Sequence, residues 1–557
     1  MGGRQRHVGV DDTVQEQLQD GRPWWAGADR APWWADRVGY HVYVRTFADH
    51  DGDGVGDLEG LRARLDYLAW LGVGFLWLSP CFPSPLHDGG YDVADYDTVA
   101  DELGGSAALD RLLADAHARD IRVLLDLVPN HTSSAHPWFT ASRSSRADPY
   151  RAWYVWRDGA ADGGPPNNWV SVFGGPAWSY DPHTAQWWLH SFLPEQPDLN
   201  WANPAVKDAF DGIVQRWMAR GVDGFRVDVA HGLVKHPALP DLPARPGGGE
   251  VDPTDPHAVY HALEHRFDVD QPGVLDVYRR WRGLDADGQL LLLGEVYLLD
   301  PARLRRYVAD CSGLSLAFWF PVMEVSWDAT ELRATLEAGA ATAPGSMAWV
   351  TSSHDAPRAA TRFGGGQRGR RRALVLATLQ HALPGVPLLY QGEELALTDV
   401  PIDPAAARDP IAVRAGASHR ARDGSRTPMP WQPGPQAGFS AAATTWLPVG
   451  PRTPADTVAV QQADPASWLH AYRRLLAVRR HSSDLCAGDL RWVEEVPDDV
   501  IAFRRGSLLI VANTGARPRR WGQPAGSLLY TTDLDVGADG TTWSGLLPAE
   551  TAVIVRT

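Results

Sequence analysis

The chain has 557 residues, of which 44% are hydrophobic and 22% are charged. This length exceeds what one ordinary core accommodates, so two or three domains of a globular protein are expected. The formal net charge of −16 argues against nucleic acid and anionic membranes as partners, and it suits a neutral small-molecule substrate.

The start of the chain and its cysteines indicate the compartment. No apolar signal-peptide stretch follows Met1, and no run approaches the roughly 18 apolar residues needed to span a membrane. Cys81, Cys311 and Cys486 form a sparse, odd set without a disulfide framework. We therefore expect a cytoplasmic protein. Nothing in the residue pattern predicts an oligomeric state.

Residues 1–30 are polar and irregular, and we expect them to form an N-terminal extension. After them, short apolar runs alternate with helical patterns such as 58–71 and 107–119. The predicted strands are 40–47, 73–79, 121–128, 224–229, 290–297, 314–320, 347–352 and 386–391. Nearly continuous apolar runs are typical of parallel strands covered on both faces. The pattern predicts an α/β fold, a (β/α)8 TIM barrel.

Some connections are too long for plain loops of such a barrel. Residues 132–200, rich in Trp, Gly and Pro, predict an inserted domain after the third strand. The barrel itself is expected over 31–131 and 201–485. Residues 486–557 change to short alternating runs between turn residues, which predicts a C-terminal antiparallel β-sandwich.

Polar residues gather where the predicted strands end, the rim at which barrel enzymes place their sites. The third strand ends in the segment 126–131 (DLVPNH), the fifth in 294–297 (GEVY) and the seventh in 352–355 (SSHD). The fourth ends in 224–232 (GFRVDVAHG), where Arg226 and Asp228 share one face of the strand. An Arg beside an Asp favours the ionised carboxylate. By itself that carboxylate is either half of an ion pair or a nucleophile.

These segments, in this order, resemble the signature regions of the α-amylase family of glycoside hydrolases, family 13. Further matches indicate the oligo-1,6-glucosidase and α-glucosidase branch of that family. They are QPDLN at 196–200, RDGSRTPMPW at 422–431, and the stretch from Asn167-Asn168-Trp169 to Gly174-Gly175-Pro176-Ala177-Trp178. The resemblance runs from about residue 33 to the C-terminus and is weakest in the C-terminal sandwich.

The resemblance implies a role for each of three carboxylates. Asp228 would be the nucleophile, Glu295 the general acid/base, and Asp355 the carboxylate that binds sugar hydroxyls. Retaining cleavage of a glycoside needs two carboxyl groups about 5–5.5 Å apart, one ionised and one protonated. It needs no metal and no organic cofactor.

The resemblance also implies the residues that hold the sugar. They are Tyr91, Asp92, His131, Arg226, His354 and Arg422. Tyr91 would stack under the sugar ring, and Asp92 would pair with Arg422 to close the pocket at the non-reducing end. A closed pocket implies exo action on short α-glucosides of the maltose or isomaltose type, or on sucrose. The alternative for Asp92 and Arg422 is an ordinary salt bridge.

The loop 49–57 (DHDGDGVGD) spaces acids with glycines and can surround a hard cation with oxygens. It is not an EF-hand, because Gly60 stands where that loop needs a bidentate Glu. The branch carries a structural Ca²⁺ or Mg²⁺ in this loop. The implied ligands are Asp49, Asp51, Asp53, the Val55 carbonyl and Asp57. The alternative is an acidic turn without a metal.

Ser353 departs from the family motif, and Val229 concerns the choice of linkage. Ser353 stands where the family usually has Asn, which could alter the hydrogen bonding around His354. Val229 follows Asp228, and in this branch Val there tends to accompany activity on α-1,6 links.

Two further functions remain open. One is a transglucosylase or isomerase of the same family, such as a trehalose synthase, a sucrose isomerase or a glucosyltransferase. The other is a non-catalytic protein like the heavy chains of amino-acid transporters. Those proteins have lost catalytic residues and gained a transmembrane helix, whereas this chain keeps all three carboxylates and has no such helix in its sequence pattern.

Overall fold

The computed structural model describes Pro23, Trp25 and residues 31–246, 252, 255–308, 313–415, 421–522, 526–536 and 540–557. The expected extension over 1–30 therefore lies outside the described residues, apart from Pro23 and Trp25. Among the residues described, no helix combines the length and the apolar character needed to cross a membrane.

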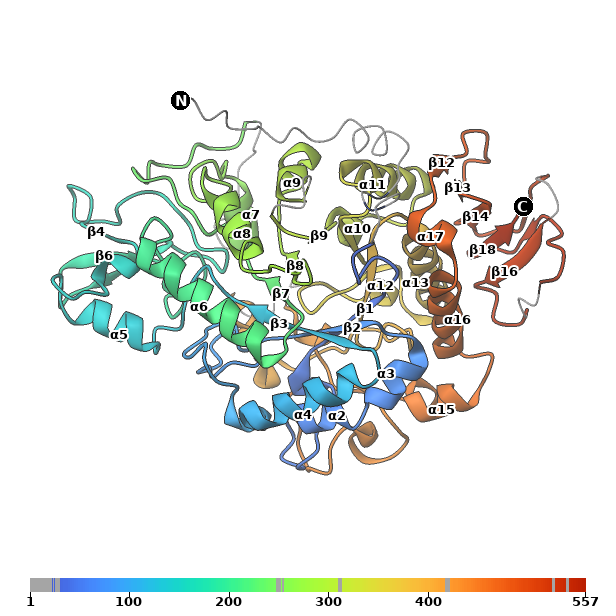
Figure 1. The fold of residues 1–557 in the computed structure, drawn as a ribbon, viewed down its shortest axis with the longest axis horizontal. Coiled ribbons are helices and arrows are strands. Elements are labelled where there is room, and N and C mark those ends of the chain that lie inside the picture. The colour runs from blue at the N-terminus through green and yellow to red at the C-terminus, as the bar shows by residue number, and fades with distance from the viewer. Residues whose placement is uncertain are drawn as a thin grey trace.

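A closed barrel of parallel strands forms the centre of the molecule (Figure 1). Its strands are β1 (Gly39–Val42), β2 (Phe75–Leu78), β3 (Arg122–Leu127), β7 (Gly224–Val227), β8 (Leu291–Gly294), β9 (Leu316–Phe318), β10 (Met347–Val350) and β11 (Val386–Tyr390). Neighbours in the chain are neighbours in the barrel, and β11 closes it against β1. The predicted barrel is confirmed. Its strands are almost entirely buried, which explains why they read as apolar runs.

Helices cover the outside of the barrel (Figure 1). The longer ones are α4 (Gly105–His117), α6 (Pro204–Arg220), α8 (Val274–Arg282), α11 (Ala329–Thr342), α13 (Gly366–Ala382) and α16 (Trp468–Arg480). The helix expected over 58–71 is divided into α2 (Leu58–Arg62) and α3 (Leu65–Leu71). The break occurs because Arg64 leaves the helical region, with φ −105° and ψ 5°.

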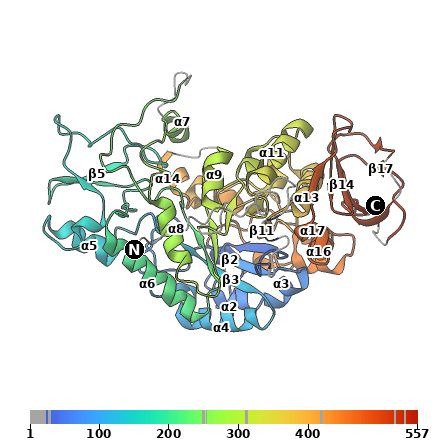
Figure 2. The ribbon, with the colours of Figure 1, turned by 45° about the horizontal axis from the view of Figure 1, so that its top comes forward.

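The segment after β3 holds the helix α5 (Pro137–Ser144) and a small sheet in the order β4-β6-β5. Its strands are β4 (Trp156–Arg157), β5 (Trp178–Asp181) and β6 (Gln186–Leu189). Figures 1 and 2 both place this segment at one end of the molecule and the C-terminal sheet at the other.

The C-terminal part is antiparallel, as predicted. A five-stranded sheet has the order β12-β13-β14-β18-β16, and a two-stranded sheet pairs β15 with β17. The strands are β12 (Leu490–Trp492), β13 (Val500–Arg505), β14 (Leu508–Asn513), β15 (Arg519–Arg520), β16 (Ser527–Thr531), β17 (Leu546–Leu547) and β18 (Thr551–Arg556). Helix α13 of the barrel contacts β14 and β18.

Candidate active site

Three carboxylates follow barrel strands at the same rim. Asp228 follows β7, Glu295 follows β8, and Asp355 lies in the loop after β10. A Cβ on Gly224 would lie 2.2 Å from the carbonyl oxygen of Leu291, so β7 and β8 run in close contact below this rim. All three carboxylates line one cavity of about 500 Å³.

Arg226 is the centre of the charged network in this cavity. Its Nη1 lies 2.9 Å from Oδ1 of Asp126 and 2.6 Å from Oδ1 of Asp228. Its Nη2 lies 3.0 Å from Oε1 of Glu295. One buried guanidinium thus serves three carboxyl groups, and its single positive charge cannot balance three negative ones.

Burial and neighbouring charges shift the pKa of two carboxyl groups that contact Arg226. The pKa of Asp228 is raised, first by burial and then by the neighbouring Glu295 and Asp126, although Arg226 opposes this shift. Burial also raises the pKa of Asp126 to about 6. Arg226 thus favours the ionised form of Asp228, as expected from the sequence, while burial and the neighbouring carboxylates act against it. Asp126 and Asp228 titrate as coupled groups, so neither pKa belongs to one residue alone.

The backbone beside Asp228 holds Glu295 in place. The N–H of Val229 donates to Oε2 of Glu295 at 2.9 Å, and the N–H of Ala230 donates to the Glu295 carbonyl at 2.8 Å. Val229 has φ +44°, which is strained for a β-branched residue. The strained turn after β7 thus directs the N–H groups of Val229 and Ala230 toward Glu295, which follows β8.

Asp355 is surrounded by cationic and aromatic groups. Nη1 of Arg422 and Nη2 of Arg426 each lie 2.9 Å from its Oδ1, and Nε2 of His354 lies 3.1 Å from its Oδ2. Burial raises the pKa of Asp355, but His354 and the two arginines outweigh it, so the net shift is downward. Asp355 is consequently ionised in the pocket.

Tyr91 and His354 form one wall of the cavity. Their rings are stacked with centroids 5.5 Å apart and planes at 7°. The Tyr91 hydroxyl contacts Nε2 of His354 at 2.6 Å and Oδ2 of Asp126 at 3.0 Å. His131 also lines the cavity, with its Nε2 3.1 Å from the Tyr91 carbonyl oxygen. Tyr91, His131 and His354 therefore line the same cavity.

The predicted pair of Asp92 and Arg422 is wrong, because Asp88 takes that place. Nη2 of Arg422 donates to Oδ1 of Asp88 at 2.9 Å, and Asp88 lines the cavity. Asp92 is fully buried and instead accepts hydrogen bonds from the Ser84 hydroxyl and from the N–H groups of His87 and Asp88. Asp92 therefore stabilises the turn that presents Asp88.

Asp409 and Arg426 were not predicted as site residues. Arg426 belongs to the segment 422–431, so the motif itself contained a signal for it. Asp409 bonds the side chain of Arg422, and no sequence pattern points to it. Ser353 accepts a hydrogen bond from the N–H of Asp355 at 3.1 Å, so its hydroxyl supports the loop that carries this carboxylate.

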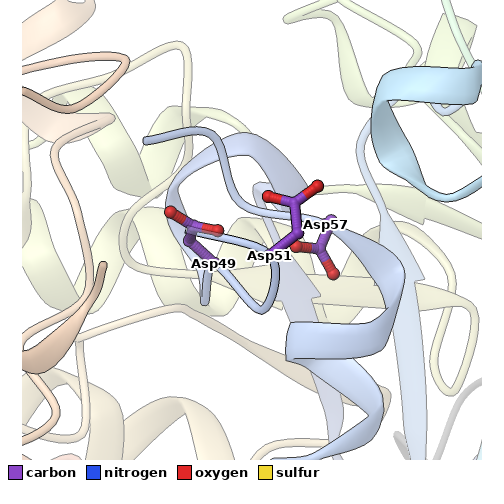
Figure 3. Close-up of side chains that lie close together, drawn as sticks. All are labelled: Asp49, Asp51 and Asp57. Carbon is purple, nitrogen blue, oxygen red and sulfur yellow. The ribbon is translucent and has the colours of Figure 1, made fainter. Parts of the chain in front are cut away.

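A second acidic cluster lies in the loop after β1 (Figure 3). Asp49, Asp51 and Asp57 place carboxylate oxygens within 4.8 Å of one another, which fits a hard cation with oxygen ligands. Asp53 is outside this group, and its Oδ1 accepts the N–H of Val55 at 2.7 Å.

The family follows from comparison with known proteins. A family model described as "Alpha amylase, catalytic domain" matches residues 41–488. The chain belongs to the α-amylase family. A "Probable alpha-glucosidase" of Rhizobium meliloti (strain 1021) is 39% identical to this chain, over 90% of this chain and 89% of its own length.

Other similar proteins carry names of glucosidases and glucosyl-transferring enzymes. An "Oligo-1,6-glucosidase" of Parageobacillus thermoglucosidasius is 35% identical over 85% of this chain and 87% of its own length. The crystal structure of an "alpha-glucosyl transfer enzyme, XgtA" is 38% identical, with a TM-score of 0.86 over 95% of this chain and 100% of that one. The trehalulose synthase MutB from Pseudomonas mesoacidophila MX-45 is 30% identical, with a TM-score of 0.85 over 95% and 100%.

Proposed function

We propose that this protein is a retaining α-glucosidase that removes glucose from the non-reducing end of short α-glucosides. The observation that carries the proposal is the convergence of Asp228, Glu295 and Asp355 on one cavity. The curated relatives named α-glucosidase and oligo-1,6-glucosidase support the same activity.

The chemistry divides between two carboxyl groups. Asp228 attacks the anomeric carbon as the bond to the aglycone oxygen breaks, and Glu295 gives its proton to that oxygen. Water then attacks the glucosyl-Asp228 intermediate and returns a proton to Glu295. Arg226 contacts both carboxyl groups and so holds them at one site for these two roles. Ionised Asp355 accepts hydrogen bonds from sugar hydroxyls.

The contacts at one end of the cavity support the proposed exo action. Arg422 bridges Asp88 and Asp355, and its guanidinium lies 5.3 Å from the ring of Phe173 in the inserted segment. This arrangement closes the pocket beyond the terminal glucose. The cavity of about 500 Å³ has room for a short oligosaccharide, in agreement with a preference for short substrates.

Transglucosylation or isomerisation is the second candidate. The cavity is also lined by Val229, Tyr297, Phe320 and Met323. An apolar wall there favours an acceptor sugar over water in the second step. Solved relatives are named as an α-glucosyl transfer enzyme and a trehalulose synthase. The retained carboxylates disfavour a non-catalytic transporter subunit.

Product analysis tests the proposal. Maltose, isomaltose, sucrose, trehalose and maltodextrins are each incubated with the protein, and products are separated by chromatography. We expect glucose as the main product from the disaccharides, with slow attack on long chains. Predominant new oligosaccharides would favour the transglucosylase, and rapid internal cleavage of starch would contradict the closed pocket. The Asp228→Asn protein is the control.

We also propose a structural Ca²⁺ or Mg²⁺ in the loop 49–57, supported by the three clustered carboxylates. Asp53 and the Val55 carbonyl complete the proposed ligand set. The free thiols of Cys81 and Cys486 support our proposal of a cytoplasmic location.

A further inference from the structure

A buried carboxylate outside the cavity holds the residue that closes it. Asp409 is 1% exposed, and its carboxylate makes a side-on pair with Arg422. Nε of Arg422 donates to Oδ2 at 3.1 Å and Nη2 donates to Oδ1 at 2.8 Å. The backbone N–H of Arg422 adds a third bond to Oδ2 at 2.6 Å.

The two sides of the guanidinium therefore have different partners. One edge is taken by Asp409, which does not line the cavity, while the remaining N–H groups reach Asp88 and Asp355, which do. A bidentate pair fixes the plane of a guanidinium as well as its position. With that plane fixed, Nη1 faces Asp355 and Nη2 also reaches Asp88.

Asp409 is itself fixed by the neighbour of Arg422. Oδ2 of Asp423 accepts the N–H of Arg408 at 2.7 Å and the N–H of Asp409 at 2.9 Å. The loop that carries Asp409 is thus hydrogen-bonded to residues 422–423 in both directions: the Asp409 side chain accepts from Arg422, and the Asp423 side chain accepts from the backbone of the loop.

We propose that Asp409 is a positioning residue: it sets Arg422 across the end of the cavity and thereby determines affinity for a terminal glucose. This inference rests on the proposed function. Asp409 touches neither the sugar nor the reacting atoms and acts through Arg422. The low pKa of Asp409, about 2, agrees with a carboxylate that stays ionised beside its arginine.

The test is a double-mutant cycle between Asp409→Asn and Arg422→Ala. The kinetic parameters KM and kcat are measured with 4-nitrophenyl α-D-glucoside, and the dissociation constant of glucose is measured by calorimetry. Asp409→Asn is expected to raise KM and the glucose dissociation constant about tenfold to hundredfold, as the loss of a charge-assisted pair implies, with kcat changed less than about fivefold. In a protein that already carries Arg422→Ala, adding Asp409→Asn should change KM and the glucose dissociation constant by no more than about twofold.

Two further variants separate positioning from folding. Asp403→Asn is the matched control, because Asp403 lies in the same loop and caps the short turn η4 (Pro404–Ala406) without contacting Arg422. It should leave KM unchanged. Asp409→Glu keeps the charge and should recover part of the lost affinity. If thermal unfolding shows that Asp409→Asn is poorly folded, the KM of Asp409→Glu is compared with that of the wild type instead.

Additive effects in the cycle, or a KM for Asp409→Asn equal to that of Asp403→Asn, would overturn the proposal. Failure of the proposed function looks different, because the wild-type protein would then release no 4-nitrophenol. The calorimetric cycle with glucose would still decide the role of Asp409.

Discussion

Nη1 of Arg226 lies 2.6 Å from Oδ1 of Asp228, in a part of the cavity where both side chains are almost completely buried. The same guanidinium contacts Asp126 and Glu295. Arg226 thus holds the proposed nucleophile and the proposed acid/base in one network and cannot neutralise both. Retaining cleavage requires one ionised and one protonated carboxyl group, and Arg226 contacts both of the groups proposed for these roles.

Replacing Asp228 with Asn should abolish turnover without unfolding the protein. Asn has the same shape and removes a buried carboxyl group whose pKa is already raised, so thermal stability should be kept or increased. Loss of a covalent nucleophile should lower kcat by at least about 10⁴-fold. The measurement is glucose release from maltose together with circular dichroism. Substantial residual activity would rule out Asp228 as the nucleophile.

Azide distinguishes the two carboxyl roles by the stereochemistry of its product. In Glu295→Ala, azide attacks the glucosyl-enzyme and should give α-glucosyl azide from an aryl α-glucoside. In Asp228→Ala, azide attacks the substrate itself and should give β-glucosyl azide. Without azide, the Glu295 variant should lose roughly 10²- to 10⁴-fold in kcat on maltose. The anomers are identified by NMR, and the same anomer from both variants would contradict the assignment.

The barrel was predictable because its strands are buried on both faces and read as apolar runs. The break at Arg64 was not, because the apolar pattern continues across α2 and α3. The three carboxylates were predictable because each follows a strand directly or within a short loop. Asp409 meets Arg422 only through folding of the long segment after β11, so no local pattern points to it.

The error at Asp92 has a local cause. Asp88 and Asp92 flank a turn in which Gly89 and Gly90 both have positive φ, 59° and 112°. Because the chain changes direction at these two glycines, side chains before and after them point to different sides of the turn. The sequence shows that an aspartate lies near the pocket, but it does not show whether Asp88 or Asp92 faces the cavity.

Asp88 and Asp92 should respond differently to substitution. Asp88→Asn removes the partner of Arg422 at the pocket end, and it should raise KM for maltose roughly tenfold to hundredfold, the effect of losing a charge-assisted hydrogen bond. Asp92→Asn should mainly lower thermal stability, because Asp92 bonds the turn and does not line the cavity. Kinetics and thermal unfolding of both variants provide the comparison. A rise in KM for Asp92→Asn but not for Asp88→Asn would support the pairing of Asp92 with Arg422.

Calcium should stabilise the protein through the loop 49–57. Without a cation, Asp49, Asp51 and Asp57 repel one another, so a chelator should lower Tm and added Ca²⁺ should restore it. Asp51→Asn should abolish the calcium-dependent part of Tm. Asp287→Asn, at an exposed loop position, is the control and should keep it. A Tm insensitive to chelator and calcium would show that the loop is an acidic turn only.

Glu393 should make stability depend on pH near neutrality. This carboxyl group lies after β11, and burial raises its pKa to about 7 from an ordinary value of 4.5. Because the folded state binds the proton more tightly than the unfolded state, the stabilisation is complete below about pH 4.5. It is lost as the pH rises through 7.

The loss amounts to about 3 kcal/mol at most, since each pKa unit corresponds to about 1.4 kcal/mol. Glu393→Gln cannot ionise and should remove this part of the pH dependence, whereas Glu337→Gln, on the exposed side of α11, should not. Urea unfolding of the wild type and both variants at pH 5 and pH 8 measures the difference. Equal pH slopes for the wild type and Glu393→Gln would show that Glu393 has an ordinary pKa in the folded protein.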